Sequence, residues 1–150
     1  MSRRPSGLSL AALLAGLLAL SGCVTPATGD DSYRGKAYLS LEAATSEVET
    51  TSLTVAVVLR HGIFTTTADE TVTASEKALG SISAAFESVQ PPPQSDPLRD
   101  QVSQLLSDAE DAVAATRIAI RRSDRAALAE VASNLGTVSE QLDQAERGLG

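Results

Sequence analysis

The chain has 150 residues, a formal net charge of −7 at pH 7 and a single cysteine, so an intrachain disulfide is excluded. The excess of acidic side chains argues against binding to nucleic acid and against electrostatic adhesion to anionic lipid. With no tryptophan and only four Tyr and Phe residues, a core must be built from Ala, Leu, Val and Ile, which favours closely packed helices.

The N-terminal segment has the charge and hydrophobicity pattern of a secretory signal. Arg3 and Arg4 precede an apolar run from Leu8 to Leu20, and two small residues follow it. The run has 13 residues, whereas a transmembrane helix needs roughly 20. We therefore expect residues 1–22 to be a cleaved signal peptide. The general secretory route is favoured over the twin-arginine route because the residues after Arg4 do not continue the twin-arginine pattern.

The end of this segment, Leu20-Ser21-Gly22-Cys23, resembles the lipobox of bacterial lipoproteins. The resemblance covers only the first 23 residues. It implies a diacylglycerol thioether on Cys23 and cleavage between Gly22 and Cys23. Two acyl chains suffice for stable anchoring, which would place the protein on the outer, extracytoplasmic face of a cell membrane. The alternative is an ordinary signal peptide that leaves a free thiol.

Cleavage would leave a mature chain of 128 residues, enough for one domain, with 10 basic and 19 acidic side chains. Residues 23–32 contain Cys23 and a segment rich in Pro, Gly, Asp and Ser, which predicts a short tether. Residues 33–150 then form the domain.

Apolar residues recur from Tyr33 onward at alternating steps of four and three, which predicts amphipathic helices. The first helix ends before Gly62, a candidate left-handed cap. Its stripe is Ala37, Leu41, Ala44, Val48, Thr51, Val55 and Val58. Residues 50–63 are rich in β-branched side chains and could suit a strand. We interpret them as helical because the spacing continues through them and no second strand-like run exists.

Three more helices follow by the same reasoning. The second begins at a possible capping box over residues 67–70 and stops at Pro91-Pro92-Pro93. The third opens at Asp96-Pro97, with Asp as the cap, and Ser123 or Asp124 caps the fourth. Four such helices joined by short turns predict an all-α, up-down four-helix bundle.

In that topology the turns after the first and third helices share the end farthest from the anchor. This predicts a cationic tip composed of Arg60, His61, Arg117, Arg121, Arg122 and Arg125. The basic residues could complement the negative C-terminal ends of the helix dipoles. Alternatively, they could bind an anionic envelope polymer or an acidic partner protein.

Other candidate sites are weaker. His61 is the only histidine, and no Glu-x-x-His pair, Gly-x-Ser-x-Gly elbow or phosphate loop accompanies it. Asp108, Glu110 and Asp111 suit a solvated helix face. The stripe hydroxyls of Thr51, Ser75 and Thr116 could bond the carbonyl one turn back or line a small ligand cavity. Tyr33 and Tyr38 could rest at the lipid headgroups or pack at the base of the bundle.

We expect no metal, no cofactor and no catalytic set. The sequence therefore favours a lipid-anchored cell-envelope protein with a non-catalytic scaffold or protein-interaction role. The alternative is a sensor or carrier module that holds a small ligand between its helices.

Overall fold

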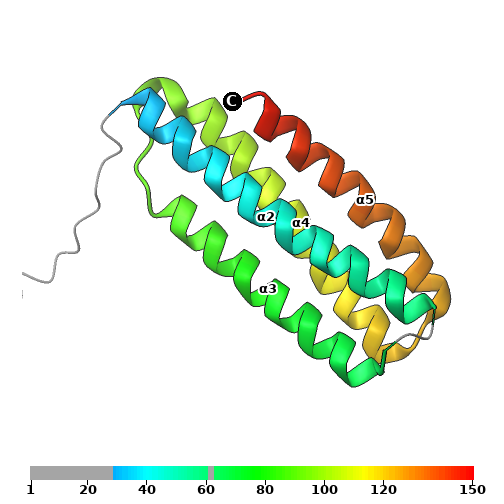
Figure 1. Ribbon diagram of the computed structural model, residues 1–150. Helices are drawn as coiled ribbons and strands as arrows, with labels where there is room; N and C mark the ends of the chain where they lie inside the picture. The colour runs from blue at the N-terminus through cyan, green and yellow to red at the C-terminus, as the bar shows by residue number, and fades with distance from the viewer. Residues whose placement is uncertain (1–28, 61–62) are drawn as a thin grey trace, which may run out of the picture.

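The computed structural model describes residues 29–60 and 63–150, and within these ranges the chain is helical with no strand. The α-helices are α2 (Asp30–Leu59), α3 (Thr65–Glu87), α4 (Asp96–Arg122) and α5 (Arg125–Arg147). A short 3₁₀ helix, η1 (Pro93–Ser95), precedes α4. Consecutive helices run in opposite directions (Figure 1), which confirms the predicted up-down four-helix bundle.

The helices form a closed ring in chain order, so each packs against two neighbours. In addition α2 contacts α4 across the centre, whereas the backbones of α3 and α5 do not approach each other closely within the described residues. Both α2 and α4 bury small side chains, among them Ala37, Ala44, Ala109 and Ala112. Small side chains allow two helix axes to approach closely, which explains the central position of α2 and α4.

The core is mainly aliphatic, as the composition predicts, and Tyr33 and Phe86 are its largest buried side chains. Every predicted stripe residue of α2 from Ala37 to Val55 is fully buried, and Val58 is half-buried. At 27 residues α4 is about 40 Å long. The β-branched segment is helical from residue 50 through Leu59, which confirms the prediction for that part, whereas Arg60 lies in a turn and Ile63 in a bend. Gly62 lies outside the described residues.

Side-chain contacts fix the two ends of the bundle. At the end we call the base, Ser95 Oγ donates to Asp30 Oδ1 at 2.7 Å, and Arg34 Nη2 lies 3.3 Å from the carbonyl oxygens of Gly148 and Leu149. The base thus joins the start of α2, η1 and the end of α5. At the opposite, distal end Arg125 Nη2 donates to the Leu59 carbonyl at 3.0 Å, which joins α5 to the end of α2.

Three predicted helix starts are wrong by one to three residues. α2 begins at Asp30, so residues 30–32, predicted as tether, form its first turn, where Asp30 and Asp31 complement the helix dipole. α3 begins at Thr65 without a side-chain cap, which places Thr67 inside the helix and leaves the capping box unused. Asp96 is the first residue of α4 and Ser95 precedes it as the cap, because η1 already turns the chain.

The predicted start of the last helix is confirmed. Asp124 is the N-cap of α5, and its Oδ1 accepts hydrogen bonds from the backbone N–H groups of Ala126 and Ala127 at 3.0 and 3.1 Å. Ser123 before it has a φ of 53°, in the left-handed region. A single left-handed residue followed by a capped start reverses the chain within two positions.

Candidate functional site

The arginines predicted for the tip lie on the distal half of the bundle, but in different environments. Arg60 and Arg122 are exposed and form no ion pair with any described residue. Arg125 is occupied by the Leu59 carbonyl. His61, like Gly22 and Cys23, lies outside the described residues.

The other two arginines contact carboxylates of α3. Arg121 Nε donates to Asp69 Oδ1 at 2.8 Å and its Nη2 to Oδ2 at 3.2 Å. Arg117 makes the same two-pronged contact with Glu76, one to two turns closer to the middle of the bundle. The hydrogen bonds from Arg121 hold the pKa of the Asp69 carboxyl below its ordinary 3.8. Two of the predicted cations are therefore compensated locally, which the sequence pattern did not indicate.

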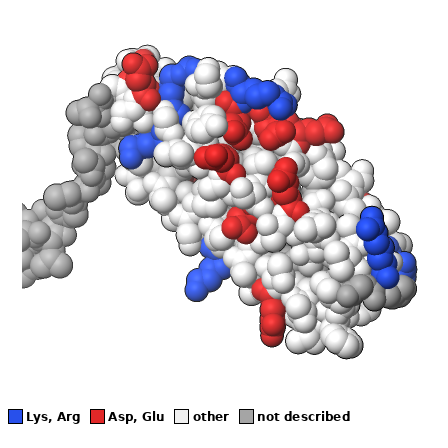
Figure 2. Space-filling model, in the orientation of Figure 1, with Lys and Arg blue, Asp and Glu red and all other residues white. Residues whose placement is uncertain are grey.

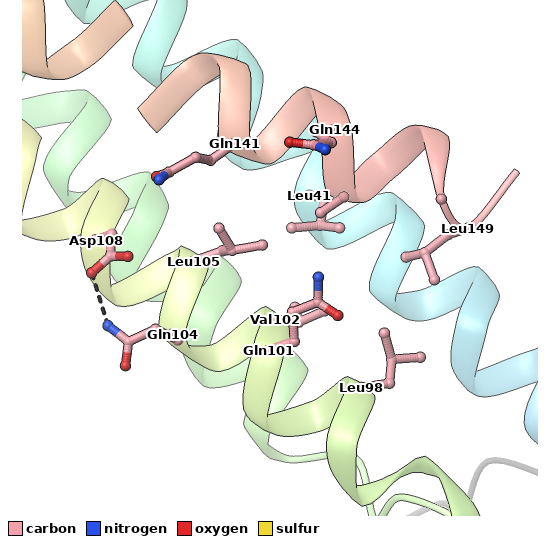
Figure 3. Close-up of a pocket in the computed structure, with 12 residues that line it drawn as sticks. Leu41, Leu98, Gln101, Val102, Gln104, Leu105, Asp108, Gln141, Gln144 and Leu149 are labelled. Carbon is pink, nitrogen blue, oxygen red and sulfur yellow. Dashed lines mark hydrogen bonds between the residues drawn. The ribbon is translucent and has the colours of Figure 1, made fainter. Parts of the chain in front are cut away.

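A groove of about 610 Å³ lies between α4 and α5 near the base (Figure 3). Its floor includes Leu41 of α2, which is fully buried. Leucines and glutamines line the walls: Leu98, Leu105, Leu149, Gln101, Gln104, Gln141 and Gln144. The small residues Ala145 and Gly148 also line it, so α5 fills this part of the interface incompletely.

The groove combines aliphatic contact with uncharged hydrogen-bonding groups. Each glutamine carboxamide offers two N–H donors and one acceptor oxygen. Gln104 Nε2 donates to Asp108 Oδ1 at 2.8 Å (Figure 3), and Asp108 is the only ionisable side chain that lines the groove. Such a lining suits a neutral molecule rich in amide or hydroxyl groups rather than an anion.

These glutamines do not stand out in the sequence as candidate site residues. The available signal was a Gln-x-x-Gln spacing that occurs once in α4 and once in α5, at Gln101 and Gln104 and at Gln141 and Gln144. Residues three apart share a helix side, but the pairing of the two helices was needed to bring the two sides together. A second groove, of about 470 Å³, continues the α4–α5 interface distally, between Ile118 and Val131.

Two of the three buried hydroxyls on the stripes, those of Thr51 and Thr116, bond the carbonyl one turn back, as the first of the two predictions states. Thr51 and Thr116 are fully buried, and each donates to the carbonyl four residues back, at 2.9 and 2.8 Å. Neither these two nor Ser75 lines the α4–α5 groove.

The aromatic residues near the start of α2 pack within the bundle. Tyr33 is fully buried with its ring 5.6 Å from that of Phe86. Tyr38 is half-buried and its hydroxyl bonds Glu146, which raises the pKa of Tyr38. Ordinary packing at the base is therefore confirmed for Tyr33.

The described part of the chain shows neither a metal-binding cluster nor a membrane-spanning helix. Residues 29–60 and 63–150 contain no cluster of three His, Cys, Asp or Glu side chains suited to a metal ion. The acidic residues of α4 have separate surroundings: Asp108 lines the groove, Glu110 accepts a hydrogen bond from Ser83, and Asp111 is exposed. In the same ranges, no helix combines the length and hydropathy of a membrane span.

Comparison with known proteins identifies no relative. No family model matches the chain, and no curated protein or solved structure is significantly similar to it.

Proposed function

We propose that the protein is a cell-envelope lipoprotein, held on the outer face of a membrane by lipid on Cys23, with a non-catalytic scaffold or interaction role. The observation that supports this most directly is the Leu20-Ser21-Gly22-Cys23 motif after a short apolar run. The helical bundle that follows the anchor would be the part that binds other envelope molecules.

The position of the bundle agrees with this proposal. α2 begins at Asp30, so only residues 24–29 separate it from Cys23. Six residues span about 20 Å at most. The base, including the α4–α5 groove, would therefore lie near the lipid headgroups, and the distal end would face away from the membrane.

The anchor is tested with the variant Cys23→Ser in intact cells. We expect the variant to keep its signal peptide and to lose the membrane-bound form of mature mass, because thioether formation precedes cleavage at a lipobox. Ser32→Ala, in the exposed first turn of α2, is the control and should remain membrane-bound. A Cys23→Ser protein that still fractionates with membranes at its mature mass contradicts the anchor.

A second candidate function is supported by the α4–α5 groove. Its volume of about 610 Å³ lies within the range of about 300–1,000 Å³ typical of small-molecule sites. A neutral ligand held there would make the protein a sensor or carrier. Thermal stabilisation by neutral amides or sugars that disappears in Leu105→Trp, which fills the groove, would favour this function.

A further inference from the structure

α2 carries apolar residues on two opposite faces. The inner stripe is buried against the other helices, as described above. On the outer face Leu39 and Leu53 are 61% and 67% exposed. They lie 14 residues apart, two heptads and almost four complete turns, so both point to the same side of the helix.

The residues between these leucines continue the same spacing. We call the six positions the outer seam of α2: Leu39, Ala43, Ser46, Thr50, Leu53 and Val57. Their alternating steps of four and three match a coiled-coil contact line. None is charged, and Ser46 Oγ already donates to the Glu42 carbonyl at 3.2 Å. A partner that covers the seam therefore buries no unpaired charged side chain of α2.

The borders of the outer seam are acidic. Glu42 and Glu49 are exposed along one border and the half-buried Glu47 lies along the other, and α2 has no lysine or arginine between Lys36 and Arg60. Figure 2 shows acidic side chains gathered across the middle of the face that α2 crosses in Figure 1. An uncharged, largely aliphatic line with carboxylates at its borders complements a helix whose apolar stripe is bordered by Lys or Arg.

We infer that the outer seam of α2 binds a basic amphipathic helix of another envelope protein. This inference rests on the proposed interaction role and names the class of partner. A second copy of this chain is a poor occupant, because two copies anchored to one membrane would lie parallel. Glu42 and Glu47 would then face each other across the contact, and like charges there destabilise the pair.

The probe is a synthetic helix of four heptads with Leu and Val on its stripe and Lys on both borders. The matched control peptide carries Glu at those border positions. Full-length protein in phosphatidylcholine nanodiscs is titrated against each labelled peptide by fluorescence anisotropy at low salt, with empty nanodiscs as the blank. We expect the Lys peptide to bind at least tenfold more tightly than the Glu peptide, with an affinity that falls as salt screens the charges.

Variants connect the binding to the outer seam. Leu53→Ser should weaken binding of the Lys peptide by about tenfold, because it removes one buried aliphatic contact. The double variant Glu42→Lys and Glu49→Lys should reverse the preference between the two peptides. Ile118→Ser, an exposed apolar residue of α4 at 44% exposure, is the matched control and should bind as the unmodified protein does.

Three results overturn the inference: no binding of the Lys peptide, equal binding of both peptides, or unchanged binding by Leu53→Ser. A dimer in analytical ultracentrifugation that Leu53→Ser dissolves would assign the seam to a second copy instead. If the lipid anchor is wrong, the protein is recovered from the soluble fraction and the titration proceeds without nanodiscs. Fractionation thus tests the lipid anchor, and the peptide titration tests the outer seam independently of it.

Discussion

The hydroxyl of Tyr33 is a buried polar group that lacks a hydrogen-bond partner among the described residues. The ring of Tyr33 packs against Phe86. Burial also raises the pKa of Tyr33. A buried polar group that lacks a partner costs about 1–3 kcal/mol of stability.

Replacing Tyr33 by Phe should therefore stabilise the bundle. We expect Tyr33→Phe to raise the free energy of unfolding by about 1 kcal/mol, the low end of that cost, in urea denaturation followed by circular dichroism. Tyr38→Phe is the control, because the Tyr38 hydroxyl bonds Glu146 and its removal should bring no gain. A loss of stability in Tyr33→Phe would contradict the absence of a partner.

Two carboxylates should make stability depend on acid pH. Hydrogen bonds from Ser95 to Asp30 and from Arg121 to Asp69 lower both carboxyl pKa values below 3.8. A lowered folded-state pKa gives stability that is present above the unfolded pKa and lost as the pH falls through the folded one. The free energy of unfolding should therefore decline below about pH 4.

Variants identify the source of this decline. In denaturation series between pH 2 and pH 6, Asp69→Asn and Ser95→Ala should each flatten the slope of stability against pH. Ser133→Ala, on the exposed side of α5, should leave the slope as it is. Equal slopes in all proteins would mean that other groups produce the acid sensitivity.

At the scale of elements, two residues of the turn between α4 and α5 have opposite effects on stability: Asp124 stabilises the turn and Ser123 strains it. Asp124 caps α5 with two hydrogen bonds, so Asp124→Ala should cost about 1 kcal/mol. Ser123 has a left-handed backbone that glycine adopts without strain, so Ser123→Gly should gain up to about 1 kcal/mol. Thermal unfolding should show the melting temperature move in opposite directions. If both variants shift the melting temperature in the same direction, the Asp124 cap and the Ser123 backbone conformation do not determine the stability of the turn.

At the scale of the whole molecule, the distal end is less cationic than the chain order alone predicts. Arg121 forms an ion pair with Asp69, and Arg117 forms one with Glu76. Carboxylates of α3 therefore neutralise these two arginines. Arg60 and Arg122 are exposed and form no ion pair within residues 29–60 and 63–150. They are the residues with which to test a cationic tip.

If the tip binds an acidic polymer, the double variant Arg60→Glu and Arg122→Glu should weaken retention on immobilised poly-L-glutamate several-fold at low salt. Folding should be unaffected because no ion pair of the described residues is broken. Lys77→Glu, an exposed change on α3, is the control. Retention that stays unchanged in the double variant contradicts the cationic tip.

The fold was predictable because its determinants are local and periodic. The spacing of Ala37, Leu41, Ala44 and Val48 specifies a helix and its buried face without reference to any other part of the chain. The short turns then require antiparallel neighbours. The helix starts were predicted less accurately than the helices themselves. At Asp96 the reason is η1, a turn that depends on contacts with the start of α2.

The sequence by itself determined four amphipathic helices, their alternating direction, the gathering of arginines toward one end and the motif at Cys23. Only the tertiary structure decided which surfaces remain open. The rotation of each helix leaves Leu39 and Leu53 uncovered, and the pairing of α4 with α5 brings the glutamines together. These features depend on angles and separations between helices. Such quantities are set by the packing of all side chains at once, and no single stretch of the chain contains them.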